Sequence, residues 1–144
     1  MTLEAIFSVA NMTALASWLA LAASPLFPKA AILVAGRIVP LLLAVAYTGL
    51  IIAFWTRAQG GFDSLANVQL LFTMPEMVLA GWLHYLAFDL FVGAWETRTA
   101  RDEGIPHLLL LPCLVLTFLF GPVGLLAFVA LRAARTPSLK ALTS

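Results

Sequence analysis

The chain has 144 residues, of which 62% are hydrophobic and only 10% are charged, and its formal net charge is +1. A soluble domain carries about 25% charged residues, and a soluble fold of this size could not bury so much apolar surface, so an all-α integral membrane protein is expected. The charge gives no indication of a nucleic-acid partner. The single cysteine, Cys113, excludes a disulfide framework and a cysteine-based metal site.

Four apolar stretches are each long enough to cross a hydrocarbon core of about 30 Å. They cover about residues 5–23, 38–55, 77–95 and 108–131, which predicts one four-transmembrane-helix bundle over residues 1–144. No lysine or arginine precedes the first stretch, so we expect it to be retained rather than cleaved as a signal peptide. Pro40 is expected in the first turn of the second stretch, and Pro122 is expected to kink the fourth.

The connections between these stretches are short, except for residues 56–76. Within this segment, Asp63-Ser64 is a suitable cap for a short helix from Leu65 to Phe72 that would lie along the membrane surface. A loop at headgroup depth is an equal alternative.

Four crossings would put both chain ends on the same side of the membrane. With that topology the basic residues divide four against four, so the positive-inside rule favours neither orientation strongly. The cluster in the C-terminal tail is the densest, and we therefore expect both ends in the cytoplasm.

The third stretch contains the segment GWLHYLAFDLFVGAWE, residues 81–96, with a histidine and an aspartate near its middle. An ionisable side chain inside a bilayer costs about 2.5–3.5 kcal/mol, so His84 and Asp89 need a partner, a water-filled cavity or a ligand. At about 100° per residue, two stripes form on this helix. One stripe holds Trp82, Tyr85, Asp89 and Glu96, and the other holds His84, Phe88, Phe91 and Trp95.

His84 and Asp89 point about 140° apart, so each is expected to face a different neighbouring helix. Asp89 either ties helices together or exchanges protons during function, and Asn11 on the first stretch is expected to approach Asp89 or Tyr85. His84 has three interpretations. It is a neutral hydrogen-bonding side chain, an acid–base group, or an axial ligand to the metal of a pigment or haem.

Three parts of the sequence resemble the abscisic-acid-deficient-four family of small four-span membrane proteins. They are Phe7-Ser8-Val9-Ala10-Asn11, the residue 81–96 segment, and Leu111-Pro112-Cys113 followed by Phe120-Gly121-Pro122-Val123-Gly124. In plants this family is needed to form neoxanthin from violaxanthin. The resemblance therefore implies a protein that handles a carotenoid or a similar long apolar molecule.

The implied reaction converts an epoxycarotenoid to an allenic alcohol without net redox change. An acid protonates the epoxide oxygen, and a base removes a proton from the nearby polyene carbon. His84 and Asp89 are the leading acid–base candidates, although Tyr85 or Glu96 would serve a ring near the end of the rod better. The expected ligand-binding side chains are Trp82, Phe88, Phe91, Trp95 and Asn11.

A carotenoid-epoxide isomerase is thus the leading hypothesis, in an inner or photosynthetic membrane, with lipid and a long apolar ligand as partners. No cofactor is required, although bound carotenoid or (bacterio)chlorophyll is compatible with the sequence. One alternative is a non-catalytic subunit that binds pigment or braces a photosynthetic complex, with His84 as a pigment ligand and otherwise no metal site. Another is a small proton-coupled transporter that uses Asp89.

Overall fold

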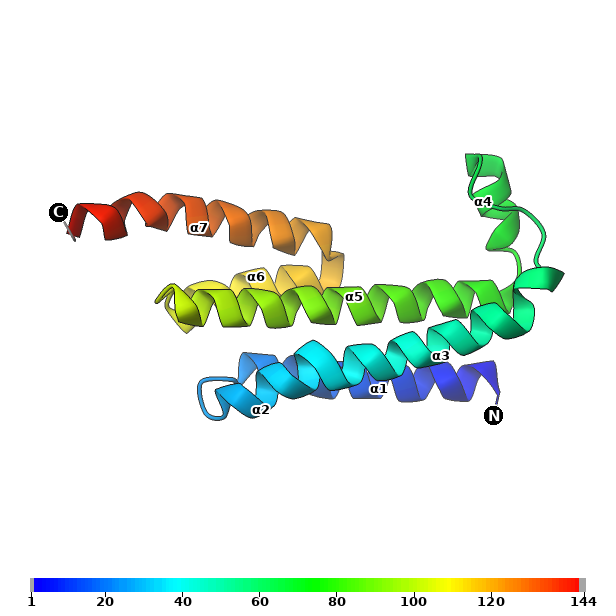
Figure 1. The fold of residues 1–144 in the computed structure, drawn as a ribbon, viewed down its shortest axis with the longest axis horizontal. Coiled ribbons are helices and arrows are strands. Elements are labelled where there is room, and N and C mark those ends of the chain that lie inside the picture. Colours follow the sequence, from blue (N-terminus) through cyan, green and yellow to red (C-terminus); the bar gives the residue numbers. More distant parts are fainter. Residues whose placement is uncertain (1, 143–144) are drawn as a thin grey trace.

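The structure, a computed structural model, describes residues 2–142, with side chains through residue 135. All regular elements in this range are helical, as the sequence predicts (Figure 1). They are α1 (Leu3–Ala22), α2 (Pro28–Leu33), the π-helical η1 (Val34–Ile38), α3 (Val39–Phe54), the 3-10 helix η2 (Trp55–Arg57), α4 (Leu65–Leu71), α5 (Pro75–Asp102), α6 (His107–Phe120) and α7 (Pro122–Leu142).

Within the described residues, three helices are long and apolar enough to cross a membrane: α1, the continuous run Pro28–Arg57, and α5. The most buried of the three is α5. Half of its apolar 18-residue segment is buried inside the protein, against 28% for the corresponding segment of α1 and 22% for that of Pro28–Arg57. Figure 1 shows α1 and α3 on one side of α5 and α6 on the other. Many large apolar side chains remain exposed on the outer faces of these helices, as expected for contact with lipid.

The short helix predicted after residue 63 is confirmed as α4. The Ser64 hydroxyl caps it by accepting the Asn67 backbone N–H at 3.2 Å. The Asp63 carboxylate accepts the Asn67 side-chain amide at 2.9 Å. These two contacts satisfy polar groups at the start of the helix, so the segment does not remain a loop.

The second membrane helix begins at Pro28, ten residues earlier than the sequence predicts, so Pro40 lies well inside it rather than in its first turn. Proline has no N–H and its ring clashes with the carbonyl four residues before it. The helix widens into the π turn η1 just ahead of Pro40, and the Val39 N–H donates to the Val34 carbonyl, five residues back. The proline is thus accommodated by a π bulge without ending the helix.

The predicted fourth crossing, residues 108–131, is wrong as a single helix. Gly121 has a φ of +30° and ends α6, and Pro122 then begins α7. A positive φ is accessible to glycine at little cost, and proline is favoured in the first turn of a helix. The chain therefore reverses at this point instead of kinking, and α6 and α7 form a helical hairpin whose tip lies beside the middle of α5 (Figure 1).

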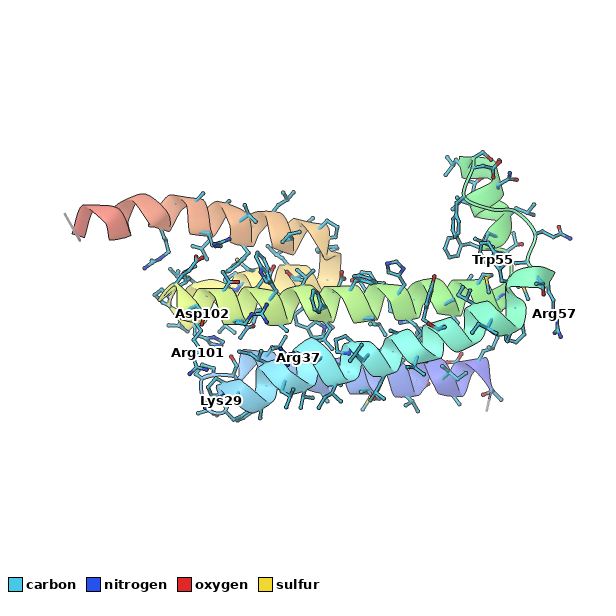
Figure 2. All side chains as sticks on the ribbon, in the orientation of Figure 1. Lys29, Arg37, Trp55, Arg57, Arg101 and Asp102 are labelled. Atoms are coloured by element: carbon cyan, nitrogen blue, oxygen red, sulfur yellow. The ribbon has the colours of Figure 1, made fainter. Side chains whose placement is uncertain are left out.

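The hairpin places the two ends of the described chain at opposite ends of the bundle (Figure 1), which contradicts the expectation that they share one side. It also changes the distribution of charge. In Figure 2, Lys29 and Arg101 lie at one end, Arg37 lies farther in but in the same half of the bundle, and Arg57 lies at the other end. Because α7 returns towards the first of these ends, its basic residues join that side. The predicted division of four against four is therefore wrong.

Candidate functional site

The polar and aromatic side chains of α5 point in three directions. Trp82, Tyr85 and Asp89 face α1 and α6 and line a shared pocket. His84 faces α3, where its ring meets that of Tyr47 edge-on at 5.9 Å between centroids. Glu96 points into the protein interior. The structure therefore separates the four predicted catalytic residues into one pair and two isolated groups.

The pocket between α1, α5 and α6 has a volume of about 300 Å³. Most of its lining is apolar or aromatic, as in the small-molecule sites of other proteins. The lining residues are Asn11, Ala14, Leu15, Trp18, Trp82, Tyr85, Leu86, Asp89, Phe118 and Leu119. Asn11, Trp82, Tyr85 and Asp89 were predicted as site residues, and the other six were not. Of those six, Trp18 lies seven residues after Asn11 and therefore on the same face of α1.

Asn11 fixes the orientation of an aromatic wall of this pocket. Its side-chain oxygen accepts the indole N–H of Trp82 at 3.0 Å, and its amide donates to the Phe7 carbonyl at 2.9 Å. The Trp82 ring in turn stacks on Tyr85, with 5.2 Å between centroids. Asn11 therefore lines the same pocket as Tyr85 and Asp89, but its hydrogen-bond partner on α5 is Trp82 rather than either of these two predicted residues.

Tyr85 ties the hairpin tip to α5. Its hydroxyl lies 3.1 Å from the carbonyl oxygens of both Phe118 and Leu119, in the last turn of α6. Carbonyls in the last turn of a helix have no intrahelical donor, so the tyrosine supplies one to the end that Gly121 leaves open.

Asp89 lies near the middle of α5, and its carboxyl group is against the hairpin turn. A Cβ built on Gly121 would be 2.6 Å from Oδ1 and 2.9 Å from Oδ2 of Asp89. Oδ2 is buried and has no hydrogen-bond partner among the described residues. Buried polar atoms in proteins are rarely left unpaired, so this oxygen is a candidate acceptor for a ligand in the pocket.

Glu96 does not reach the pocket. It is 0% exposed, and the hydroxyl of Thr117, also 0% exposed, donates to its two carboxyl oxygens at 2.9 and 3.1 Å. The pair joins α5 to α6 in the interior, which agrees with a structural position rather than one in contact with substrate. Thr117 was not predicted, but it is the only hydroxyl residue between His107 and Leu131 in the sequence.

The remaining predicted ligand residues lie elsewhere. Phe88 and Phe91 line an apolar groove between α3 and α5. The ring of Phe88 contacts the exposed ring of His84, with 4.7 Å between the ring centroids. Trp95 packs edge-on against Phe128. In the described part of the chain, no group of three histidine, cysteine or acidic residues is placed to hold a metal ion.

Comparison with known proteins adds one match. A family model described as ABA DEFICIENT 4-like matches residues 5–128, which is most of the chain and includes every residue that lines the pocket. No curated protein and no solved structure matches the chain.

Proposed function

Because the chain belongs to the ABA DEFICIENT 4-like family, we propose that it binds an oxygenated polyene in the pocket between α1, α5 and α6 and isomerises its epoxide. This membership bears out the resemblance of the first, third and fourth apolar stretches to that family. The observation that carries the proposal is the unpartnered, buried Oδ2 of Asp89 in a mostly apolar pocket, with Tyr85 one helical turn away on the same helix. A titratable pair in such surroundings is typical of acid–base sites.

In the proposed reaction, Tyr85 donates a proton to the epoxide oxygen while the bond from that oxygen to the polyene-side carbon breaks. The Asp89 carboxylate removes a proton from the next polyene carbon, and the electron pair of that C–H bond forms the new double bond of the allene. Transfer of the proton from Asp89 back to Tyr85 restores both groups. One proton moves from carbon to oxygen, so no oxidant or reductant is needed.

This proposal assigns to Tyr85 the role that the sequence suggested for His84. His84 faces α3, and it does not line the pocket that contains Asp89. A proton transfer needs the two groups within hydrogen-bond reach of the same substrate. Tyr85 and Asp89 line the same pocket, which supports their assignment as the acid–base pair.

The depth of Asp89 favours a substrate whose reacting end lies near the centre of the bilayer. From Asp89 to Pro75 is 14 residues of α5, or about 21 Å at 1.5 Å per residue. A second apolar hollow of about 400 Å³ shares Trp82 with the pocket and includes Phe7, Val78 and Leu79 towards that end of α5. Together the pocket and this hollow suit a polyene chain that extends from Asp89 to one membrane surface. Such a chain is shorter than a whole carotenoid, which is about as long as the bilayer is thick.

A proton-coupled transporter is a second candidate function, and the hairpin favours it. Broken helices whose tips lie near the bilayer midplane, beside an intramembrane acid, are typical of binding sites in secondary transporters. The tip at Gly121 touches Asp89 in this manner.

Three measurements on the purified protein separate these functions, the first two in detergent and the third after reconstitution into vesicles. An added epoxycarotenoid or epoxyapocarotenoid that is converted to its allenic isomer, as resolved by chromatography and mass spectrometry, supports catalysis. Stoichiometric colour without turnover supports the pigment-binding alternative. Proton uptake into vesicles that depends on an added solute, without isomerisation, would support the transporter.

A further inference from the structure

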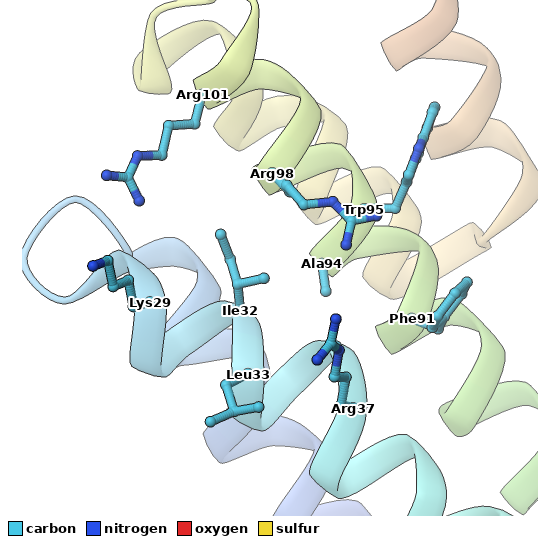
Figure 3. A pocket seen from close by; sticks show the side chains of 10 residues that line it. Lys29, Ile32, Leu33, Arg37, Phe91, Ala94, Trp95, Arg98 and Arg101 are labelled. Atoms are coloured by element: carbon cyan, nitrogen blue, oxygen red, sulfur yellow. The ribbon is translucent and has the colours of Figure 1, made fainter.

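A second pocket, unrelated to Asp89, lies between the second membrane helix and the C-terminal end of α5. It has a volume of about 280 Å³, and four of its ten lining residues are cations: Lys29, Arg37, Arg98 and Arg101. None of the lining residues is acidic. Figure 3 shows Arg37 and Arg98 on either side of Ala94, with Lys29 and Arg101 farther along the same two helices.

The fold holds these like charges close together. Gly36 lies directly against α5, since a Cβ added there would be 2.9 Å from the Cβ of Ala94. The π turn η1 includes Arg37 at this contact. Among the described side chains, the only ion pair joins Arg132 to Glu103, so none of the four cations is neutralised by a carboxylate. Like charges at close range repel one another, and an anion between them would offset that repulsion.

An apolar groove continues from this basic pocket along the seam between α3 and α5. It has a volume of about 300 Å³ and shares Gly36, Arg37 and Phe91 with the basic pocket. Farther along, it is lined by Pro40, Leu41, Ala44, Ala87 and Phe88. One continuous surface therefore offers cations at one end and hydrocarbon contact along the rest.

The position along the helices agrees with the level of lipid headgroups. The run Pro28–Arg57 has 30 residues, or about 45 Å, against a hydrocarbon core of about 30 Å. If it is centred, roughly its first five residues lie outside the core, which puts Lys29 at headgroup depth. Arg37 is the tenth residue of the run, so its backbone lies about 7 Å inside the core at 1.5 Å per residue. Arginine and lysine side chains at such positions extend their charged ends towards the interface.

We propose that this pocket and groove bind one anionic phospholipid, with its phosphate among the four cations and one acyl chain between α3 and α5. Basic pockets between membrane helices are known to suit anionic headgroups. The absence of acidic residues among the lining disfavours a diphosphate bound through a divalent cation, which would need carboxylate ligands.

The test uses the full chain in detergent and native mass spectrometry. Added ligands are dioleoylphosphatidylglycerol, dioleoylphosphatidylcholine and glycerol 3-phosphate. We expect one phosphatidylglycerol per protein, bound at least ten-fold more tightly than either of the others. The double variant Arg37→Gln/Arg98→Gln should weaken phosphatidylglycerol binding at least ten-fold. The matched control Arg57→Gln, at the opposite end of the same helix run, should leave it unchanged.

A second variant tests the groove without altering charge. Ala44 is exposed in the groove, so Ala44→Trp should occupy the space of the acyl chain and weaken phosphatidylglycerol several-fold. The proposal is overturned if the two lipids bind equally, or if glycerol 3-phosphate binds as tightly as phosphatidylglycerol. It is also overturned if phosphatidylglycerol binding is unchanged in both Arg37→Gln/Arg98→Gln and Ala44→Trp. Melting curves of each variant confirm that the comparison is made on folded protein.

Discussion

The carboxyl group of Asp89 lies against the backbone of Gly121, so close that a single added carbon at the glycine would be 2.6 Å from the carboxyl oxygen. This contact joins the middle of α5 to the tip of the hairpin. It makes the proposed site depend on the chain reversal, because the same turn positions the α6 carbonyls that Tyr85 binds.

The first prediction concerns this contact. Gly121→Ala should lower the melting temperature, because alanine at a positive φ costs about 1–2 kcal/mol and its methyl group would also clash with Asp89. The matched control is Gly49→Ala in α3, where nothing lies within 4 Å of the added carbon. Alanine favours a helix over glycine, so this control should melt at the same temperature or slightly higher. Equal melting temperatures for the two variants would contradict the observed turn.

The second prediction concerns topology. Three helices are expected to cross the membrane, and the α6–α7 hairpin returns to the side from which it enters. We therefore expect the two chain ends on opposite sides of the membrane. Lys29 and Arg101 lie at one end of the bundle, and Arg37 and Arg98 line the same pocket as these two residues. Helix α7 returns towards that end, and Arg57 lies at the other. The positive-inside rule makes the first end cytoplasmic. Reporter fusions should therefore place Thr2 outside and Ser144 in the cytoplasm. Fusions that report the same compartment would restore the four-span topology and exclude the hairpin.

The third prediction concerns the buried pair of Glu96 and Thr117. Thr117→Val removes the hydroxyl that donates to a fully buried carboxyl group, and a buried polar group without its partner costs about 1–3 kcal/mol. We expect a clearly lower melting temperature for Thr117→Val. Thr117→Ser keeps the hydroxyl donor, so its melting temperature should fall much less. If the valine variant is as stable as the parent, the hydrogen bond does not hold α6 to α5.

The fourth prediction concerns pH. Glu103 follows α5, and hydrogen bonds from the Arg132 guanidinium, including one from Nε at 2.8 Å, lower the pKa of the Glu103 carboxyl. A carboxyl whose pKa is lower in the folded state contributes stability above its unfolded pKa and loses it as pH falls through the folded pKa. Glu103→Gln should therefore destabilise the protein at neutral pH, and its difference from the parent should shrink as the pH falls below about 4.

The control for this pH dependence is Asp102→Asn, which changes an exposed neighbouring acid. It should melt like the parent across the range. A constant difference between Glu103→Gln and the parent at all pH values would mean that the effect of Glu103 does not depend on its charge.

Much of the architecture follows from local sequence. Runs of apolar residues predict α1 and α5, and the 100° periodicity separates Tyr85 and Asp89 from His84, as the structure does. The reversal at Gly121 does not follow, because a glycine before a proline is compatible with both a kinked helix and a turn. The choice depends on contacts with α5 from residues more than thirty positions away.

The site was predicted only in part for a similar reason. Glu96 and Tyr85 share a stripe on the helical wheel, but α6 covers one and leaves the other open to the pocket. Periodicity gives the direction in which a side chain points. It does not show whether a neighbouring helix extends far enough to cover that side chain. Because α6 ends halfway along α5, it covers Glu96 but not the pocket side of Tyr85. The unpartnered Oδ2 of Asp89 is likewise a property of packing that no sequence pattern contains.

The last prediction tests the proposed chemistry. Asp89→Asn keeps the shape of the side chain and its hydrogen-bonding capacity but removes the group that accepts the polyene proton. Loss of general acid–base catalysis lowers rates by about 10²–10⁴-fold, and we expect a decrease of that size in epoxide isomerisation, with protein that still extracts as a single species. Tyr85→Phe should reduce turnover as well, since it removes the proposed proton donor.

His84→Phe is the matched control, because His84 is exposed, faces α3 and packs among aromatic rings that accept another ring. It should retain full turnover. Loss of bound colour in His84→Phe, with Asp89→Asn unaffected, would favour His84 as a pigment ligand and move the function of this chain to the opposite face of α5. If Asp89→Asn and Tyr85→Phe both turn over substrate like the parent, the pocket between α1, α5 and α6 is not the site of reaction, since no other titratable side chain lines it.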